Sequence, residues 1–248
     1  MIHSFLMIGQ SNMAGRGAID EVPPICNPEL RVLRNGRWQP FFTPVNPDRP
    51  FSGISLAESF ADAYQRDHGV TVGLIPCADG GTQLEQWKPG SLLFDHAVYQ
   101  ARLAERTSNI AGILWHQGES DCKSGLCDTY LERLNRFYDA LTCALRLQDV
   151  PFIVGGLGDF LARLPEEGAY FDTVNRQLRA FADSHPRVGF ASARQLAGKP
   201  DNLHFTAAAQ RAFGLRYYEA FLPLEDKNRR FVEKSREDDA LRTAIDGL

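Results

Sequence analysis

Short apolar runs alternate along this chain with segments of helical periodicity, and this alternation strongly limits the folds open to it. The apolar runs cover residues 4–8, 70–76, 110–116, 152–156 and 188–191. They carry Ile, Val, Leu and Phe on both alternating faces, as expected of strands covered by helices on each side. Strands that alternate with helices pair in parallel through right-handed crossovers. We therefore predict an α/β fold, a three-layer α/β/α sandwich around a five-stranded parallel sheet.

Amphipathic stripes account for the helices between these runs. The stripes begin at Leu56, Phe94, Leu131 and Phe171 and continue with apolar residues at steps of three or four. Thr206 is a favourable N-cap for a last helix that reaches Phe221. Residues 1–224 are therefore expected to form one domain.

Two regions depart from this alternation. Residues 18–53 hold seven of the fourteen prolines and predict a long irregular excursion with one short hairpin around Asn35-Gly36. A loop of this length in a compact domain is often part of a binding cleft. Residues 225–248 form a charged tail with apolar residues at Phe231, Leu241 and Ile245, which we expect to be helical.

The composition excludes several classes of partner. A net charge of −4 argues against a nucleic acid or an anionic membrane surface, and no apolar run is long enough to span a bilayer. The first residues lack a basic start and a small-residue cleavage pattern, so we expect a cytoplasmic protein. The five cysteines, Cys26, Cys77, Cys122, Cys127 and Cys143, are spaced irregularly and are expected to be free thiols, although a local Cys122–Cys127 bridge stays open. Their spacing does not match a zinc site.

Polar and small residues cluster where such a sheet places its ligands, beyond the carboxyl ends of the strands. The segments that follow the first four strands are 10–13, 79–82, 117–121 and 156–159, and the fifth strand leads to 201–204. Ser11 leaves the first strand in a turn, and Asp201 and His204 stand three positions apart before the last helix. A serine, an imidazole and a carboxylate are the components of a serine hydrolase triad.

Alternatives exist for each component. Met13 stands two residues after Ser11, so the Gly-x-Ser-x-Gly elbow of α/β-hydrolases is absent. His116 competes with His204, but it lies in a predicted strand and is expected to pack in the sheet. The Gly80-Gly81-Thr82 turn matches no nucleotide-binding motif and could instead offer backbone N–H groups to a substrate oxygen, with the Gln117 side chain as a further donor.

Four segments together resemble the sialate O-acetylesterase and acetylxylan esterase branch of the SGNH hydrolases, carbohydrate esterase family six. They are Gly9-Gln10-Ser11-Asn12-Met13-Ala14-Gly15, Gly80-Gly81-Thr82, Trp115-His116-Gln117-Gly118-Glu119-Ser120-Asp121 and Asp201-x-x-His204. Their order agrees over about residues 2–222. The resemblance implies a flavodoxin-like fold and metal-independent removal of acetyl groups from sugars, with no cofactor.

The resemblance also implies residue roles. Ser11 would be the nucleophile, His204 the base and Asp201 its orienting acid, with Glu119 as a rival or helper of Asp201. The amides of Ser11 and Gly81 and the Gln117 side chain would form the oxyanion hole, although Gly80 could replace Gly81. Gln10, Asn12, Gly80 and Thr82 would contact the substrate.

Other functions remain compatible with these residues. A short-chain lipase or thioesterase would use the same triad, and a non-catalytic sugar-binding protein could keep the fold. The acetylated sugar is open between xylan fragments and O-acetyl sialic acids. Trp38 and Trp87 could stack on a sugar ring or pack in the protein.

Overall fold

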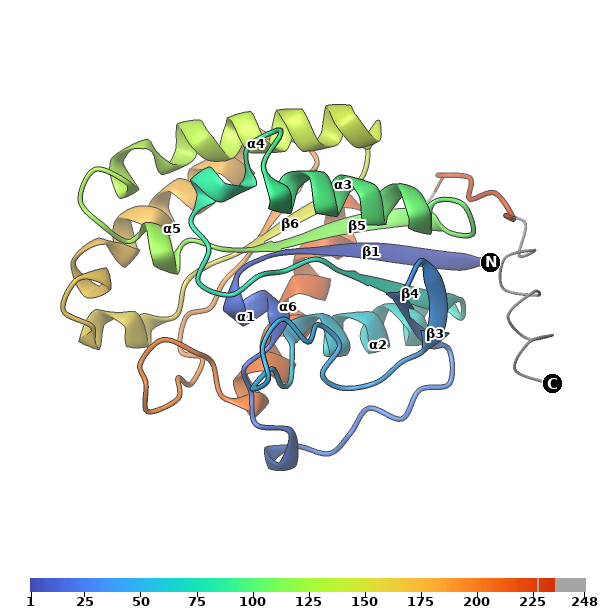
Figure 1. Ribbon diagram of the computed structural model, residues 1–248, viewed down its shortest axis with the longest axis horizontal. Helices are drawn as coiled ribbons and strands as arrows, with labels where there is room; N and C mark the ends of the chain where they lie inside the picture. The colour runs from blue at the N-terminus through green and yellow to red at the C-terminus, as the bar shows by residue number, and fades with distance from the viewer. Residues whose placement is uncertain (227, 235–248) are drawn as a thin grey trace.

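A seven-stranded sheet forms the centre of the computed structural model, which describes residues 1–226 and 228–234 (Figure 1). The strands are β1 (Ile2–Gly9), β2 (Leu30–Arg34), β3 (Arg37–Pro40), β4 (Thr71–Pro76), β5 (Asn109–His116), β6 (Phe152–Gly155) and β7 (Val188–Ala191), in the spatial order β3-β2-β4-β1-β5-β6-β7. Every neighbouring pair is parallel except β2 and β3. The predicted α/β/α sandwich is confirmed.

The predicted number of five strands is too low, because the irregular excursion supplies two more. β2 and β3 form the expected hairpin around Asn35 and Gly36, whose φ angles of 53° and 72° suit a tight two-residue turn. The hairpin then joins the sheet, since β2 pairs in parallel with β4. Its short strands lie at the edge among prolines, where hydrophobic periodicity is weak.

Helices cover both faces of the sheet. Helices α3 (Leu92–Ala104), α4 (Tyr130–Leu145) and α5 (Glu167–Ser184) lie on one face, whereas α2 (Leu56–His68) and α6 (Ala207–Phe221) pack together on the other (Figure 1). Thr206 caps α6 as predicted, because its side chain accepts a hydrogen bond from the Ala209 N–H. A short helix, α1 (Ser11–Ala14), follows β1 directly.

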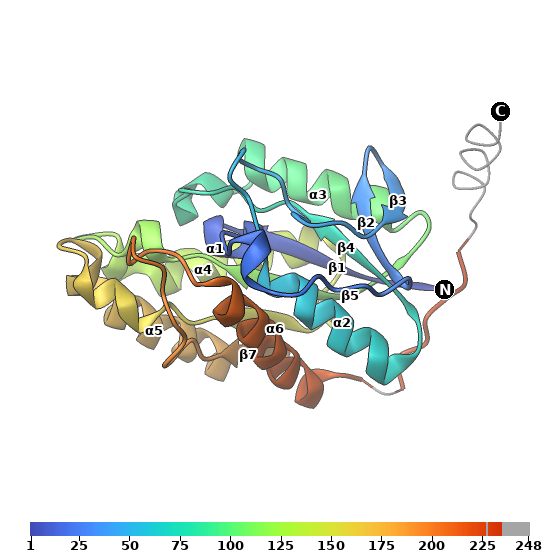
Figure 2. The same cartoon turned by 90° about the horizontal axis from the view of Figure 1, so that it is seen from below.

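The central position of β1 brings the two ends of the chain together. β1 lies between β4 and β5, and α1 begins at its carboxyl end, beside the segment that leads into α6 (Figure 2). Gly9 permits the sharp exit from β1, because it has a φ of +126° and a Cβ there would lie 2.0 Å from the His116 carbonyl oxygen.

Aromatic side chains fill the core on the α2–α6 side. The Phe5 ring packs edge-to-face on Phe60, Tyr64 and Phe221 at centroid distances of 4.8, 4.7 and 5.9 Å. Trp38 and Trp87 are buried as well, so packing and not sugar stacking accounts for both. All five cysteines are free thiols, including Cys122 and Cys127.

The described residues of the charged tail, 225–226 and 228–234, are irregular, so the expected helix is not found among them. Phe231 packs on the ring of His3 at a centroid distance of 3.8 Å, and Asn109 exchanges hydrogen bonds with the backbone of Val232. Leu241 and Ile245 lie outside the described residues. Among the helices of the described residues, none is long and apolar enough to cross a membrane.

Because His3 is buried, we expect the free energy of unfolding to depend on pH. Its Nδ1 lies 2.8 Å from the Tyr64 hydroxyl. Burial, helped by the positive charges of His68, the N terminus and Arg229, lowers the pKa of His3 to about 4. The unfolded chain takes up this proton below about pH 6.5, so the free energy of unfolding should fall between pH 6.5 and 4, by at most about 1.4 kcal/mol per pH unit.

We expect the variant His3→Gln to lose less stability than the wild type between pH 7 and pH 5. Urea denaturation at both values measures the difference. Above pH 7.5 the difference between their free energies of unfolding should not change with pH, and this serves as the control. If both proteins lost the same stability between pH 7 and pH 5, His3 would not be the source of the pH dependence.

Candidate active site

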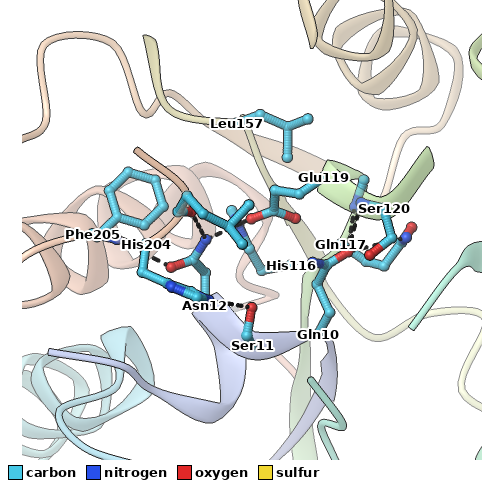
Figure 3. Close-up of polar contacts among 12 residues, drawn as sticks. Gln10, Ser11, Asn12, His116, Gln117, Glu119, Ser120, Leu157, His204 and Phe205 are labelled. Carbon is cyan, nitrogen blue, oxygen red and sulfur yellow. Dashed lines mark hydrogen bonds and ion pairs between the residues drawn. The ribbon is translucent and has the colours of Figure 1, made fainter. Parts of the chain in front are cut away.

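The nucleophile candidate and the histidine candidate meet at the carboxyl end of β1. Ser11 is the first residue of α1, and its Oγ lies 3.0 Å from Nε2 of His204, 193 positions away in the sequence (Figure 3). His204 in turn places its Nδ1 2.9 Å from Oδ2 of Asp201. The three predicted triad residues therefore form one continuous chain of hydrogen bonds.

Asp201 organises the loop that carries His204. Its Oδ1 accepts hydrogen bonds from the backbone N–H groups of Leu203 and His204 at 2.9 and 3.0 Å. Burial alone would raise the pKa of Asp201, but these bonds and the bond from the His204 ring lower it below its usual value. An ionised carboxylate only accepts, so Nδ1 of His204 carries the proton and Nε2 is free to accept the Ser11 hydroxyl.

The Glu119 carboxylate is bonded to His116 and Asn12 and not to the His204 ring. Its Oε1 accepts from Nε2 of the buried His116 at 3.0 Å and from Nδ2 of Asn12 at 2.6 Å (Figure 3). Burial alone would raise the pKa of Glu119, yet His116 and the two hydrogen bonds lower it. Of the two carboxylates, Asp201 is the one that is hydrogen-bonded to the His204 ring.

Asn12 joins the two halves of the site. Besides its bond to Glu119, its Nδ2 donates to the Leu203 carbonyl at 3.1 Å, and its Oδ1 accepts from the Phe205 N–H at 3.2 Å. These bonds hold the loop on both sides of His204 against the turn that carries Ser11. Asn12 is buried and both polar atoms of its side chain are engaged, so the geometry does not support the substrate contact expected of it.

The two glycines of the second motif have different surroundings. The Gly80 N–H donates to Oδ2 of Asp48 at 2.9 Å. The Gly81 N–H, in contrast, has no acceptor among the described residues, and neither does the Ser11 N–H in the first turn of α1. Ser11 and Gly81, not Gly80, thus hold the backbone N–H groups that are free to bind an oxyanion.

The Gln117 side chain is not available as a donor in this structure. It is fully buried, and its Nε2 donates to Oδ2 of Asp121 at 2.7 Å and to the Thr82 carbonyl at 3.1 Å. An amide NH2 group has two hydrogens, so both are engaged. Thr82 is also buried, with its hydroxyl bonded to the Asp79 carbonyl and to Nε1 of Trp87. Both residues brace the loop and do not line the cavity.

A cavity of about 290 Å³ opens over the triad, at the small end of the range for ligand sites. The expected residues that line it are Gln10, Ser11, Gly80, Gly81, Glu119 and His204. Sequence reasoning missed Arg16, Arg49, Phe51, Ser120, Glu167 and Leu203, which complete the lining. Two signals were available: the proline-rich excursion supplies Arg49 and Phe51, and the segments that follow the strands contain Ser120 and Leu203.

This sheet order, with a serine behind β1 and an Asp-x-x-His pair before α6, defines an SGNH-type hydrolase fold. The model of one protein family, described as carbohydrate esterase, sialic acid-specific acetylesterase, matches residues 1–223. The chain belongs to this family of carbohydrate esterases.

Individual proteins agree with this assignment. A probable carbohydrate esterase of Arabidopsis thaliana is 30% identical over 241 residues, 88% of this chain and 89% of the relative. Its crystal structure has a TM-score of 0.81 and 29% identity, covering 89% of this chain and 98% of the other. NanS (TM-score 0.70, 16% identity, 90% of this chain and 97% of the other) shares the fold. So does a carbohydrate acetylesterase from Xanthomonas citri (TM-score 0.66, 19% identity, 90% of this chain and 56% of the other).

Proposed function

We propose that the protein removes acetyl groups from small acetylated sugars, either xylan fragments or O-acetyl sialic acids, through a serine acyl-enzyme. The observation that carries this proposal is the hydrogen-bonded chain from Ser11 Oγ through His204 to Asp201, of which Ser11 and His204 line the cavity. The family membership supports an acetyl group as the acyl part.

The proposed reaction proceeds in two acyl transfers. Nε2 of His204 takes the Ser11 proton while Oγ attacks the acetyl carbonyl, and the resulting oxyanion binds the N–H groups of Ser11 and Gly81. His204 then protonates the departing sugar oxygen, which leaves an acetyl-serine. A water molecule repeats the sequence and releases acetate. Removal of one donor from an oxyanion hole typically costs about 2.7–4 kcal/mol of barrier.

Every step uses side chains and amides of this chain, so the proposal needs no metal or cofactor. Gln117 takes part indirectly, because its bonds to Thr82 and Asp121 hold the loop that follows Gly81. Free cysteines and the sequence prediction favour a cytoplasmic enzyme acting on small sugars. No nucleic acid or membrane partner is proposed.

The acyl chain length separates an acetylesterase from a short-chain lipase or thioesterase. A cavity of about 290 Å³ must also hold part of the sugar, so we expect kcat/KM on p-nitrophenyl esters to fall from acetate to butyrate to octanoate. A rise along this series would favour the lipase alternative. Labelling by a fluorophosphonate, located on Ser11 by mass spectrometry, reports the nucleophile, and an unlabelled, inactive protein would favour a non-catalytic sugar-binding protein. Acetate release from acetylated xylo-oligosaccharides and O-acetyl sialic acids then identifies the sugar.

A further inference from the structure

We propose that Arg49 is a positioning residue for the oxyanion hole, which it serves by fixing the Gly80–Gly81 peptide. Arg49 lies in the irregular excursion that no sequence motif marks, and it lines the cavity. The inference rests on the proposed function, because it assigns a role to the Gly81 N–H in the acyl transfer.

The geometry of one peptide bond carries the argument. Nη2 of Arg49 donates to the Gly80 carbonyl at 3.1 Å. In a planar trans peptide the C=O and the next N–H point in opposite directions, so an anchored Gly80 carbonyl fixes the direction of the Gly81 N–H. This N–H is the one that has no acceptor among the described residues. A guanidinium at the carbonyl end also polarises the peptide and strengthens its N–H as a donor.

Arg49 is itself braced, so it can hold the carbonyl in place. Nη2 also donates to Oδ1 of Asp79 at 2.8 Å, and Nη1 donates to the Asp48 carbonyl at 2.8 Å. The planar guanidinium thus connects the excursion to the turn after β4 through three acceptors. A lysine ammonium could reach only part of this set, since it lacks the fixed fork of donors.

Asp48 holds the other side of Gly80. Its carboxylate accepts the Gly80 N–H and a two-bond pair from Arg16, at 2.9 Å from Nη1 and 2.7 Å from Nη2. A larger residue at position 80 would displace the Arg16–Asp48 pair, because its Cβ would lie 2.4 Å from Nη2 of Arg16; the same Cβ would lie 3.4 Å from Cβ of Ser11. The turn therefore runs directly beside the nucleophile, clamped at its N–H by Asp48 and at its carbonyl by Arg49.

The clamp has a second point of attachment two residues earlier. Asn46 donates through Nδ2 to the Ala78 carbonyl at 3.0 Å and accepts the Ala78 N–H at 2.9 Å. Asn46 thus bonds Ala78, and Asp48, two residues further along, bonds Gly80, two residues after Ala78. Side chains of the excursion therefore make the hydrogen bonds to this segment that the backbone of a neighbouring strand would otherwise make. They do not bond the Gly81 N–H, which stays free to bind a group in the cavity.

Arg49 is the part of this clamp that can be tested without disturbing the core. The side chain of Arg49 is 40% exposed, whereas those of Arg16 and Asp48 are 3% and 5% exposed. The variant Arg49→Met keeps an unbranched apolar stem and removes every hydrogen-bond donor of the side chain. We expect kcat on p-nitrophenyl acetate to fall about 10- to 100-fold with KM changed less than about 3-fold, because both acyl transfers form an oxyanion.

Two further variants complete the experiment. Arg49→Lys should recover part of the lost kcat, because one ammonium can still donate to the Gly80 carbonyl. Arg66→Met removes another exposed arginine, which pairs with Asp62 on α2 far from the motif segments, and should keep wild-type kinetics. The melting temperatures of all variants should stay within a few degrees of the wild type.

The outcomes separate this inference from the proposed function. An active wild type matched by Arg49→Met would overturn the inference alone. A rise in KM for an acetylated sugar, with unchanged kinetics on p-nitrophenyl acetate, would overturn it as well, because Arg49 would then be a sugar contact. A loss that follows the melting temperature and is not recovered in Arg49→Lys would assign Arg49 to folding. An inactive wild type would overturn the proposed function and the inference with it.

Discussion

Ser11→Ala is expected to lower kcat/KM on p-nitrophenyl acetate by about 10⁴-fold or more. The substitution removes the oxygen that would form the acyl-enzyme, and the residual rate would come from the free N–H groups of Ser11 and Gly81 acting on attack by water. Among the described residues the Ser11 hydroxyl is hydrogen-bonded only to His204, so the fold should tolerate an alanine.

A matched substitution makes this result specific. Ser184 is an exposed serine at the end of α5, and Ser184→Ala should keep the wild-type rate. Circular dichroism and the melting temperature should not distinguish the three proteins. If Ser11→Ala kept full activity, the serine mechanism would have to be abandoned, whatever the acyl preference of the protein.

Asp201→Asn should produce the second-largest loss, about 10³- to 10⁴-fold in kcat at neutral pH. An asparagine amide can turn its NH2 group toward Nδ1 of His204, which stabilises the tautomer with the proton on Nε2. That nitrogen could then no longer accept the Ser11 proton. Because the side chain of Asp201 is 42% exposed and asparagine keeps an acceptor for the Leu203 and His204 amides, the melting temperature should change little.

Glu119→Gln provides the contrast that tests which acid serves His204. Glu119 is buried against His116 and Asn12, so its neutral replacement should lower the melting temperature clearly. Its activity should fall less than that of Asp201→Asn, because no bond joins Glu119 to His204. A larger kinetic loss in Glu119→Gln, with the melting temperature unchanged, would reverse the assignment.

The individual strands and helices were accessible from the sequence because hydrophobic periodicity is a local property. All five predicted strands and the N-cap at Thr206 occur in the structure. The hairpin at Asn35-Gly36 was also expected, but its place at the edge of the sheet was not. That place depends on the pairing of Leu30 with Val72, which no pattern within residues 18–53 reveals.

The active site, like the fold, has features that the sequence predicts and others that only the folded structure reveals. Ser11, Asp201 and His204 could be proposed from the residue types that acyl transfer needs and from where parallel strands end. The direction of each amide could not: Gln117 turns inward to Asp121 and Thr82, and Gly80 gives its N–H to Asp48. Those choices follow from hydrogen bonds that residues make with partners brought close only by folding. The sequence alone therefore determines which chemical groups the site can contain. The direction of each hydrogen-bond donor depends on the neighbouring residue that the folded chain places beside it.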